Sequence, residues 1–164
     1  MLKVFIPFAH AKSVYEINND FYKKLNIKYI LVDLDNTLDS YLSLSPKKEA
    51  YELKDRLSTD NIRMIIVSNN RGKRVSEYAN KLGVKFYNSI GKPFAFGINK
   101  LIKKENINKN EVILIGDQTS TDIPAGNRAH IKTVLTDKLV KEDQVTTRFN
   151  RIFDRPRRKR LEKK

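Results

Sequence analysis

Two aspartates lie where an apolar segment of the chain ends. Asp33 and Asp35 follow the run 29–32, so a buried strand would bring both carboxylates to the point where the chain leaves a sheet. Carboxylates this close repel each other unless a cation lies between them, and Mg²⁺ prefers such oxygen ligands. Asp33 could then attack a phosphoryl group, while Asp35 could protonate the leaving alkoxide and later activate water. The alternative, a polar turn that caps a strand, explains one aspartate better than two.

A second acidic segment follows another apolar run. Residues 113–115 predict a strand, Asp117 comes shortly after it, and Asp122 lies near the start of the next predicted helix. Asp117 is expected as a metal carboxylate, and Asp122 as a ligand through water or as the partner that orients a lysine. A Gly-Asp turn followed by an aspartate helix cap is the structural alternative. We therefore predict a Mg²⁺ cofactor with these metal-binding residues: Asp33, Asp35, Asp117 and Asp122.

Three further side chains are candidates for binding the phosphorylated substrate. Ser68 and Asn69 follow the apolar run 65–67, and the Ser68 hydroxyl with neighbouring backbone N–H groups could hold the transferring oxygens. Lys92 precedes a proline, which favours an extended backbone, and its ammonium could reduce repulsion between the phosphate and Asp33. Each has an ordinary alternative, because Ser-Asn-Asn is a common strand exit and most of the 33 basic residues must be solvated surface.

These candidates come from a chain in which short apolar runs alternate with longer amphipathic stretches. That alternation is typical of a parallel sheet covered by helices, whose ligand site lies at the carboxyl ends of the strands. The predicted fold class is α/β, a three-layer α/β/α sandwich with a doubly wound, mostly parallel five-stranded sheet and no cap domain. The expected strands are residues 28–34, 63–68, 84–87, 111–115 and 131–135. The expected helices are 13–25, 46–57 with Ser45 as N-cap, 73–82, 94–104 and 123–129.

Four motifs in this order resemble the haloacid dehalogenase superfamily: DLDNTL, VSNN, KP and GDQTSTD. The resemblance covers about residues 29–135. It implies that Asp33 is the nucleophile that forms an aspartyl phosphate and that Asp35 is the general acid and base, which is the pattern of the phosphatases in this superfamily. It also implies phosphoryl binding and Mg²⁺ binding by the remaining motif residues: Ser68 and Lys92 for the phosphoryl group, Asp117 and Asp122 for the metal.

Within that superfamily the sequence looks most like the capless subclass IIIA and its YqeG-type phosphatases, which are similar to mitochondrial phosphatidylglycerophosphatases. The intervals between the motifs are filled by the predicted helices and strands, which leaves no room for a cap over the site. An open site has to accept a large substrate that shields the reaction, or use a partner as a lid. The resemblance thus implies dephosphorylation of phosphatidylglycerophosphate to phosphatidylglycerol, a step in phospholipid biosynthesis.

The charge of the chain favours an anionic partner. Lys and Arg number 33 against 19 Asp and Glu, for a net charge of +14, and the tail 155–164 holds only part of that excess. Because there is no Cys, disulfides, thiolate metal sites and cysteine nucleophiles are excluded, and a reducing cytoplasm is compatible. At 164 residues we expect one phosphatase domain over 1–154, with 1–27 as a lead-in region and 155–164 as a flexible basic tail.

A lipid headgroup at an anionic bilayer suits the open site and the positive charge, at about 1 kcal/mol per Lys or Arg near the surface. The apolar runs are too short to span a membrane, so the expected location is cytoplasmic, peripheral at the inner face of the membrane. Arg71, Arg74 and Arg128 could bind a second phosphate of the headgroup, with a solvated basic face as the alternative. Five apolar residues could reach the acyl region, although the core is the expected place for most of them: Phe5, Ile6, Phe8, Phe94 and Phe96.

Two other functions are compatible with the sequence. One is a phosphatase for a nucleotide, a sugar phosphate, a nucleic-acid end or a phosphoprotein. The other is a basic module that binds RNA or ribosomes without turnover, through the tail 155–164, because phosphate contacts alone give salt-sensitive affinity for nucleic acid. The intact set of aspartates argues against the module, since binding alone would not require them.

Overall fold

The sheet at the centre of the protein has six parallel strands. A computed structural model describes residues 2–139, so the predicted tail 155–164 and the end of the predicted domain 1–154 lie outside the described residues. Each neighbouring pair of strands is parallel, in the order β1-β6-β5-β2-β3-β4. The strands are β1 (Ala9–Ala11), β2 (Tyr29–Asp33), β3 (Arg63–Val67), β4 (Lys85–Tyr87), β5 (Val112–Gly116) and β6 (Lys132–Thr136).

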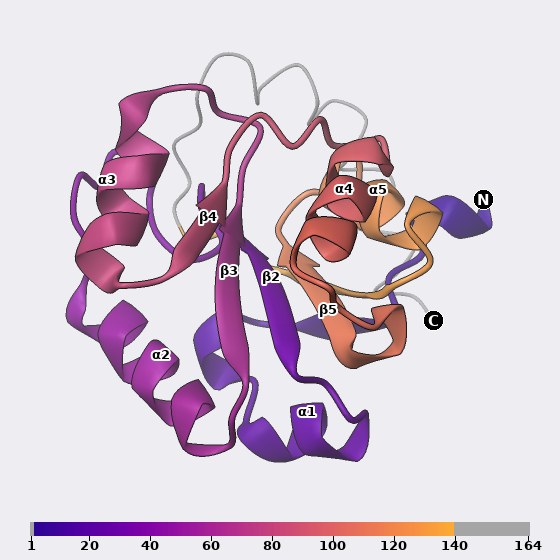
Figure 1. Cartoon of the computed structure of the whole chain (residues 1–164), viewed down its shortest axis with the longest axis horizontal. Helices are drawn as coiled ribbons and strands as arrows, with labels where there is room; N and C mark the ends of the chain where they lie inside the picture. Colours follow the sequence, from indigo (N-terminus) through magenta and orange to yellow (C-terminus); the bar gives the residue numbers. More distant parts are fainter. Residues whose placement is uncertain (1, 140–164) are drawn as a thin grey trace.

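Helices cover both faces of this sheet, which confirms the predicted three-layer α/β/α fold (Figure 1). One face carries α1 (Asn19–Lys24), α2 (Lys48–Thr59) and α3 (Lys73–Leu82). The other face carries α4 (Phe96–Lys104) and α5 (Asp122–Arg128). Single 3₁₀ turns lie at Lys3–Phe5, Val14–Glu16 and Lys109–Glu111. Among residues 2–139, no helix combines the length and the apolar character needed to cross a membrane.

The central strands bury side chains on both faces. In β2, Ile30 and Val32 contact the core under α2 and α3, whereas Leu31 between them contacts the core under α4 and α5. Burial of an aliphatic side chain of this size contributes about 1.5–3 kcal/mol relative to exposure. A continuous apolar strand therefore needs a helix layer on each side, which is why such runs predict a doubly wound parallel sheet.

The path of the chain across the sheet puts a topological switch point, called the crevice here, at the carboxyl ends of β2 and β5. From β2 the chain proceeds through α2 and α3 to β3 and β4, and it then returns past β2 to β5 and β6 through α4 and α5. The connections on the two sides of β2 thus lie on opposite faces of the sheet. A ligand site is expected at the carboxyl ends of the strands at such a switch point. Asp33 ends β2, and Asp117 directly follows β5.

Three details of the predicted elements were wrong. The sheet has six strands rather than five, because β1 pairs with β6 at one edge although Ala-His-Ala is too short and too weakly β-forming to predict. The predicted helix 13–25 is divided into a 3₁₀ turn and α1, whose start is capped by the side chain of Asn18. Helix α2 begins at Lys48, and the predicted N-cap Ser45 instead accepts a hydrogen bond from Lys81 Nζ at 2.7 Å.

Most of the apolar residues considered for lipid contact are exposed rather than in the core. Phe5 is half-buried, but the expectation is wrong for the other four, which are exposed as follows: Phe94 68%, Phe96 78%, Phe8 54% and Ile6 37%. Phe94 and Phe96 flank the start of α4 at positions that do not face the sheet. Phe8 precedes β1, an edge strand that β6 and β5 separate from β2, and its backbone N–H donates to the Thr133 hydroxyl at 3.3 Å.

Candidate active site

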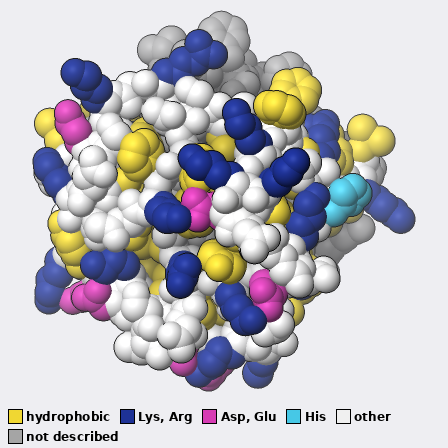
Figure 2. All heavy atoms as spheres, viewed as in Figure 1, with side chains coloured by type: hydrophobic (Ala, Val, Ile, Leu, Met, Phe, Trp, Pro, Cys, Tyr) yellow, Lys and Arg dark blue, Asp and Glu magenta, His cyan; other side chains and the backbone are white. Residues whose placement is uncertain are grey.

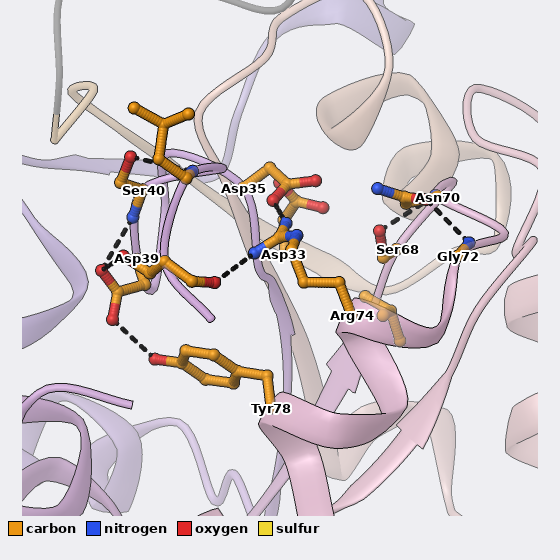
Figure 3. Close-up of polar contacts among 12 residues, drawn as sticks. Asp33, Asp35, Asp39, Ser40, Ser68, Asn70, Gly72, Arg74 and Tyr78 are labelled. Atoms are coloured by element: carbon orange, nitrogen blue, oxygen red, sulfur yellow. Dashed lines mark hydrogen bonds and ion pairs between the residues drawn. The ribbon is translucent and has the colours of Figure 1, made fainter. Parts of the chain in front are cut away.

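A tight turn after β2 separates the two aspartates of the first motif. The backbone N–H of Leu38 donates to the Leu34 carbonyl at 3.2 Å, which closes the turn. Asn36 takes the left-handed conformation within it, with φ of 65°, which Asn tolerates better than most residues. As a result the Asp33 carboxylate is buried at the end of β2, whereas Asp35 is half-buried and lies toward α3 (Figure 3).

Three carboxylates from different elements meet at the crevice. One oxygen each of Asp33, Asp117 and Asp122 lies within 4.8 Å of the others, and all three side chains are buried. Lys92, which precedes α4, is buried with them, and its Nζ lies 2.5 Å from Asp33 Oδ1 and 2.7 Å from Asp122 Oδ1. The structure therefore brings four of the predicted site residues into direct proximity.

The cluster is electrostatically unbalanced. The pKa of Asp33 is raised to about 7, because burial raises it most, Asp122 and Asp117 add to the rise, and Lys92 offsets part of it. Burial by itself would lower the pKa of Lys92, but Asp122 and Asp33 more than offset that effect, so the net direction is upward and the lysine stays cationic. The Lys92 ammonium thus offsets only part of the effect that burial and the two neighbouring carboxylates have on the pKa of Asp33.

These side chains suit a hard divalent cation. When all are ionised, the three carboxylates and one ammonium leave an excess of negative charge in a buried space. A donor set of carboxylate oxygens, without nitrogen or sulfur ligands, is typical of Mg²⁺ sites. Asp33, Asp117 and Asp122 are therefore the residues that could hold the metal.

The Asp35 carboxylate lies outside this acid cluster. Among the described residues its ion-pair partner is Arg74 of α3, whose terminal nitrogen contacts Asp35 Oδ1 (Figure 3). This placement differs from the prediction that the Asp35 side chain binds the metal, because the Asp35 carboxylate pairs with Arg74 instead. It also differs from the expectation that Arg74 is available for a second substrate phosphate.

The predicted substrate-binding residues of the other two loops have different surroundings. Ser68 is buried at the end of β3, where its hydroxyl accepts a hydrogen bond from the Asn70 N–H at 3.0 Å (Figure 3). The Asn69 amide instead holds the backbone of Lys92, accepting from its N–H at 2.8 Å and donating to its carbonyl at 2.7 Å. Asn69 thus positions the lysine in this structure, where the prediction had it contacting substrate.

Arg128 is exposed at the end of α5, and it donates to the Pro93 carbonyl at 2.8 Å. It lies near the loop of Lys92 but is not a member of the acid cluster. Its predicted contact with substrate stays a prediction.

Two residues of the site were missed by the sequence reasoning. Thr37 is buried, and its hydroxyl lies 3.5 Å from Asp117 Oδ1 as a donor. Gly116 makes room for the acid cluster, because a Cβ there would lie 2.2 Å from Asp122 Cγ. The sequence could have indicated both residues, since each belongs to a motif that also contains a predicted catalytic or metal-binding aspartate.

The fold and the acid cluster define an α/β enzyme that places carboxylates at the switch point of its sheet. The family model described as haloacid dehalogenase-like hydrolase matches residues 5–136, and the chain belongs to this family. The chain is also 32% identical over 153 residues to the probable phosphatase YqeG of Bacillus subtilis (strain 168), which covers 93% of this chain and 89% of that protein. These findings confirm the predicted superfamily and a hydrolase of the phosphatase type.

Solved structures share the fold. A cobalt-bound deoxy-D-mannose-octulosonate 8-phosphate phosphatase from Haemophilus influenzae has a TM-score of 0.54 and 19% identity, with 71% of this chain and 81% of that chain covered. A 3-deoxy-D-manno-octulosonate 8-phosphate phosphatase from Moraxella catarrhalis, in complex with magnesium, phosphate and KDO, has a TM-score of 0.53 and 19% identity, with 73% and 83% covered. At this level of identity the likeness establishes the architecture alone.

Replacing Asp117 with asparagine should remove most of the stabilisation that Mg²⁺ gives. A metal at about 100 times its dissociation constant stabilises the folded state by about 2.7 kcal/mol, or roughly 5–10 °C in melting temperature. The variant lacks one of three carboxylates, so its shift should be less than half as large. Thermal unfolding in magnesium chloride and in EDTA measures both shifts. Asp55→Asn, an exposed change on α2, is the matched control, and equal shifts in Asp117→Asn and wild type would contradict the metal assignment.

Proposed function

We propose that the protein is a Mg²⁺-dependent phosphomonoester hydrolase that acts through an aspartyl phosphate and converts phosphatidylglycerophosphate to phosphatidylglycerol. Family membership and the acid cluster support the reaction class. The observation that carries the lipid substrate is the composition of the rim segments, defined here as residues 40–48, 69–74 and 91–100. These segments surround the crevice and combine exposed apolar and basic side chains.

In the proposed reaction a carboxylate oxygen of Asp33 attacks phosphorus, and the bond between phosphorus and the substrate oxygen breaks. Asp35 gives a proton to the departing alkoxide, and it then takes a proton from the water that attacks the aspartyl phosphate, so that phosphate leaves and Asp33 is regenerated. Lys92, 2.5 Å from Asp33 Oδ1, offsets the repulsion between the carboxylate and the incoming phosphate. A bound Mg²⁺ would supply further charge neutralisation at this point.

Exposed apolar side chains lie on both sides of the crevice. One rim segment follows β2 and contacts α3, whereas another leads into α4 on the opposite face of the sheet. Together they expose four large apolar side chains: Leu42 63%, Leu44 67%, Phe94 68% and Phe96 78%. Apolar side chains in this arrangement suit insertion at the boundary between lipid headgroups and acyl chains.

The same rim segments carry more basic than acidic side chains. None of them contains Asp or Glu, and four of their basic residues are exposed: Lys48, Arg71, Lys73 and Lys100. Three of their basic residues pair with acids outside the segments: Lys48 with Glu52, Arg74 with Asp35, and buried Lys92 with Asp33 and Asp122. Over the face of the molecule that Figure 2 shows, Lys and Arg side chains are distributed widely, among exposed hydrophobic and acidic side chains. Each basic residue near an anionic bilayer contributes about 1 kcal/mol to attraction. The combination supports a peripheral position on an anionic membrane at the cytoplasmic face.

Phosphate release from phosphatidylglycerophosphate in mixed micelles with Mg²⁺ tests the substrate directly. A soluble panel of a sugar phosphate, a nucleotide and a phosphopeptide runs beside it, and Asp33→Asn controls for contaminating phosphatase. Lipid turnover that exceeds the soluble panel and vanishes in the variant would support the proposal. Turnover of soluble esters alone would keep the phosphatase and remove the lipid. No turnover, together with salt-sensitive RNA binding, would favour the nucleic-acid module.

The double variant Phe94→Ser and Phe96→Ser should lose activity on lipid relative to activity on a soluble ester. Partial withdrawal of two phenylalanines from a bilayer surface is expected to weaken binding roughly 10- to 100-fold. The measurement is the ratio of initial rates on vesicle-borne phosphatidylglycerophosphate and on p-nitrophenyl phosphate. Phe8→Ser is the matched control, since Phe8 is 54% exposed but lies outside the rim segments, before the edge strand β1. An unchanged ratio in the double variant would remove Phe94 and Phe96 from the membrane contact.

A further inference from the structure

Helix α3 holds the segment 39–45, named here the 39–45 loop, through three side chains along one face. Arg74 donates to the Ser43 carbonyl at 3.0 Å, and Lys81 Nζ donates to the Leu44 carbonyl at 3.2 Å. Between them Tyr78 donates its hydroxyl to Asp39 Oδ2 at 2.9 Å (Figure 3). Residues at these spacings lie on the same side of a helix, so α3 acts as a rigid support for the loop.

The loop is also fixed from within by a buried acid. Asp39 Oδ1 accepts from the Ser40 N–H and from the Ser43 hydroxyl, both at 2.8 Å. Asp39 is 5% exposed, and Tyr78 satisfies its other oxygen. The Ser43 carbonyl, which accepts the hydrogen bond from Arg74, is therefore held in a defined place.

Arg74 contacts this carbonyl and the Asp35 carboxylate at the same time. One terminal nitrogen bonds Ser43, and the other pairs with the Asp35 carboxylate (Figure 3). Both members of the pair are largely shielded from solvent, with side-chain exposures of 14% for Arg74 and 21% for Asp35. A guanidinium can bond in two fixed directions from one plane, which a lysine ammonium on its flexible stem does not reproduce.

We infer that Arg74 is a positioning residue, which holds the Asp35 carboxylate in the orientation required for proton transfer to the leaving alkoxide. The inference rests on the proposed function, because Asp35 acts there as general acid and base. Proton transfer needs the donor within hydrogen-bonding reach of the leaving oxygen, and Asp35 follows a turn whose geometry alone does not fix its side chain. The contact with Arg74 supplies that restraint.

The test compares two esters that differ in their need for an acid. An alkyl phosphate has a poor leaving group that requires protonation, whereas p-nitrophenolate leaves without it. The value of kcat/KM covers the steps through departure of the alcohol. Arg74→Met should lower kcat/KM about 100-fold on the alkyl ester and no more than about 3-fold on the nitrophenyl ester. In an Asp35→Asn background the same change should cost no more than about 2-fold, because the two residues act as a unit.

Lys81→Met separates orientation of Asp35 from support of the loop. Lys81 contacts the 39–45 loop but not Asp35, so this variant should leave both values of kcat/KM within about 2-fold of wild type. Arg74→Lys keeps the charge and loses the two fixed bonding directions of the guanidinium. It should show a smaller loss with the same preference between esters, and it replaces Arg74→Met in the test if that variant does not fold. Three results would overturn the positioning role of Arg74 and leave the proposed function standing: equal losses on both esters, full additivity with Asp35→Asn, or a matching loss in Lys81→Met. A wild type that hydrolyses neither ester nor phosphatidylglycerophosphate would overturn the proposed function and this inference with it.

Discussion

Asp33→Asn should abolish phosphate release, with kcat reduced by roughly 10⁴-fold or more. The carboxylate is the proposed nucleophile, and an amide oxygen at the same place cannot form a stable ester with phosphorus. Lys92 would still lie beside the altered side chain and Asp122, so binding of an anionic substrate should persist. Rapid-quench experiments with ³²P-labelled substrate measure both phosphate release and transfer of label to the protein, and both should vanish.

Folding of the Asp33→Asn variant is expected to be intact. The pKa of Asp33 is raised by burial and by its acidic neighbours, which means that its ionised form is disfavoured in the folded protein without metal. A neutral side chain of the same shape removes this repulsion, so the melting temperature in EDTA should equal or exceed that of wild type. Asp55→Asn is the matched control for activity. Retention of more than about one tenth of wild-type kcat in Asp33→Asn would exclude a covalent role for this residue.

The position of the acid cluster could be predicted from the sequence because parallel strands end on the same edge of a sheet. Asp33 and Asp117 follow apolar runs that are buried on both faces, and such runs fix both the strand and its direction. Lys92 follows only the short predicted strand 84–87, but its place between that strand and the next predicted helix put it on the same edge of the sheet. The hydrophobic pattern and the predicted topology together thus predicted which acids lie at the ends of β2 and β5.

The orientation of individual side chains could not be predicted in the same way. Asp35 lies in the turn 34–38 and pairs with Arg74 of α3, and nothing in a two-residue spacing specifies that turn or that partner. Asn69 holds the Lys92 backbone through a loop pairing that joins segments far apart in the sequence. These contacts depend on where the loops meet in space, which local sequence does not encode.

Helix α3 illustrates an intermediate case. The helix 73–82 was predicted, and Arg74, Tyr78 and Lys81 have the spacing of one helix face, but the sequence analysis singled out neither this face nor its partner. The partner is the 39–45 loop, whose anchor Asp39 stands directly after the first motif. A buried acid that is not part of a catalytic motif is thus a useful indication that a loop is held by a neighbouring helix.

Lys92→Met is expected to destabilise the protein and to reduce turnover. The lysine is buried and bonds both Asp33 and Asp122, and methionine has a similar length without the charge. Removing one partner of a buried ion pair costs about 3–5 kcal/mol, because the remaining charges are left uncompensated. Loss of one group that stabilises the phosphoryl oxygens should lower kcat by roughly 10²- to 10³-fold.

Urea unfolding in EDTA and in saturating Mg²⁺ distinguishes the charge deficit from a packing defect in Lys92→Met. If the lysine offsets carboxylate repulsion, a divalent cation should restore a large part of the lost stability, whereas a packing defect would persist with the metal present. Lys100→Met, an exposed change within α4, is the control and should change stability by less than about 0.5 kcal/mol. Wild-type stability of Lys92→Met in EDTA would show that the acids are neutral without the lysine, and its contribution would then be confined to binding the phosphoryl group.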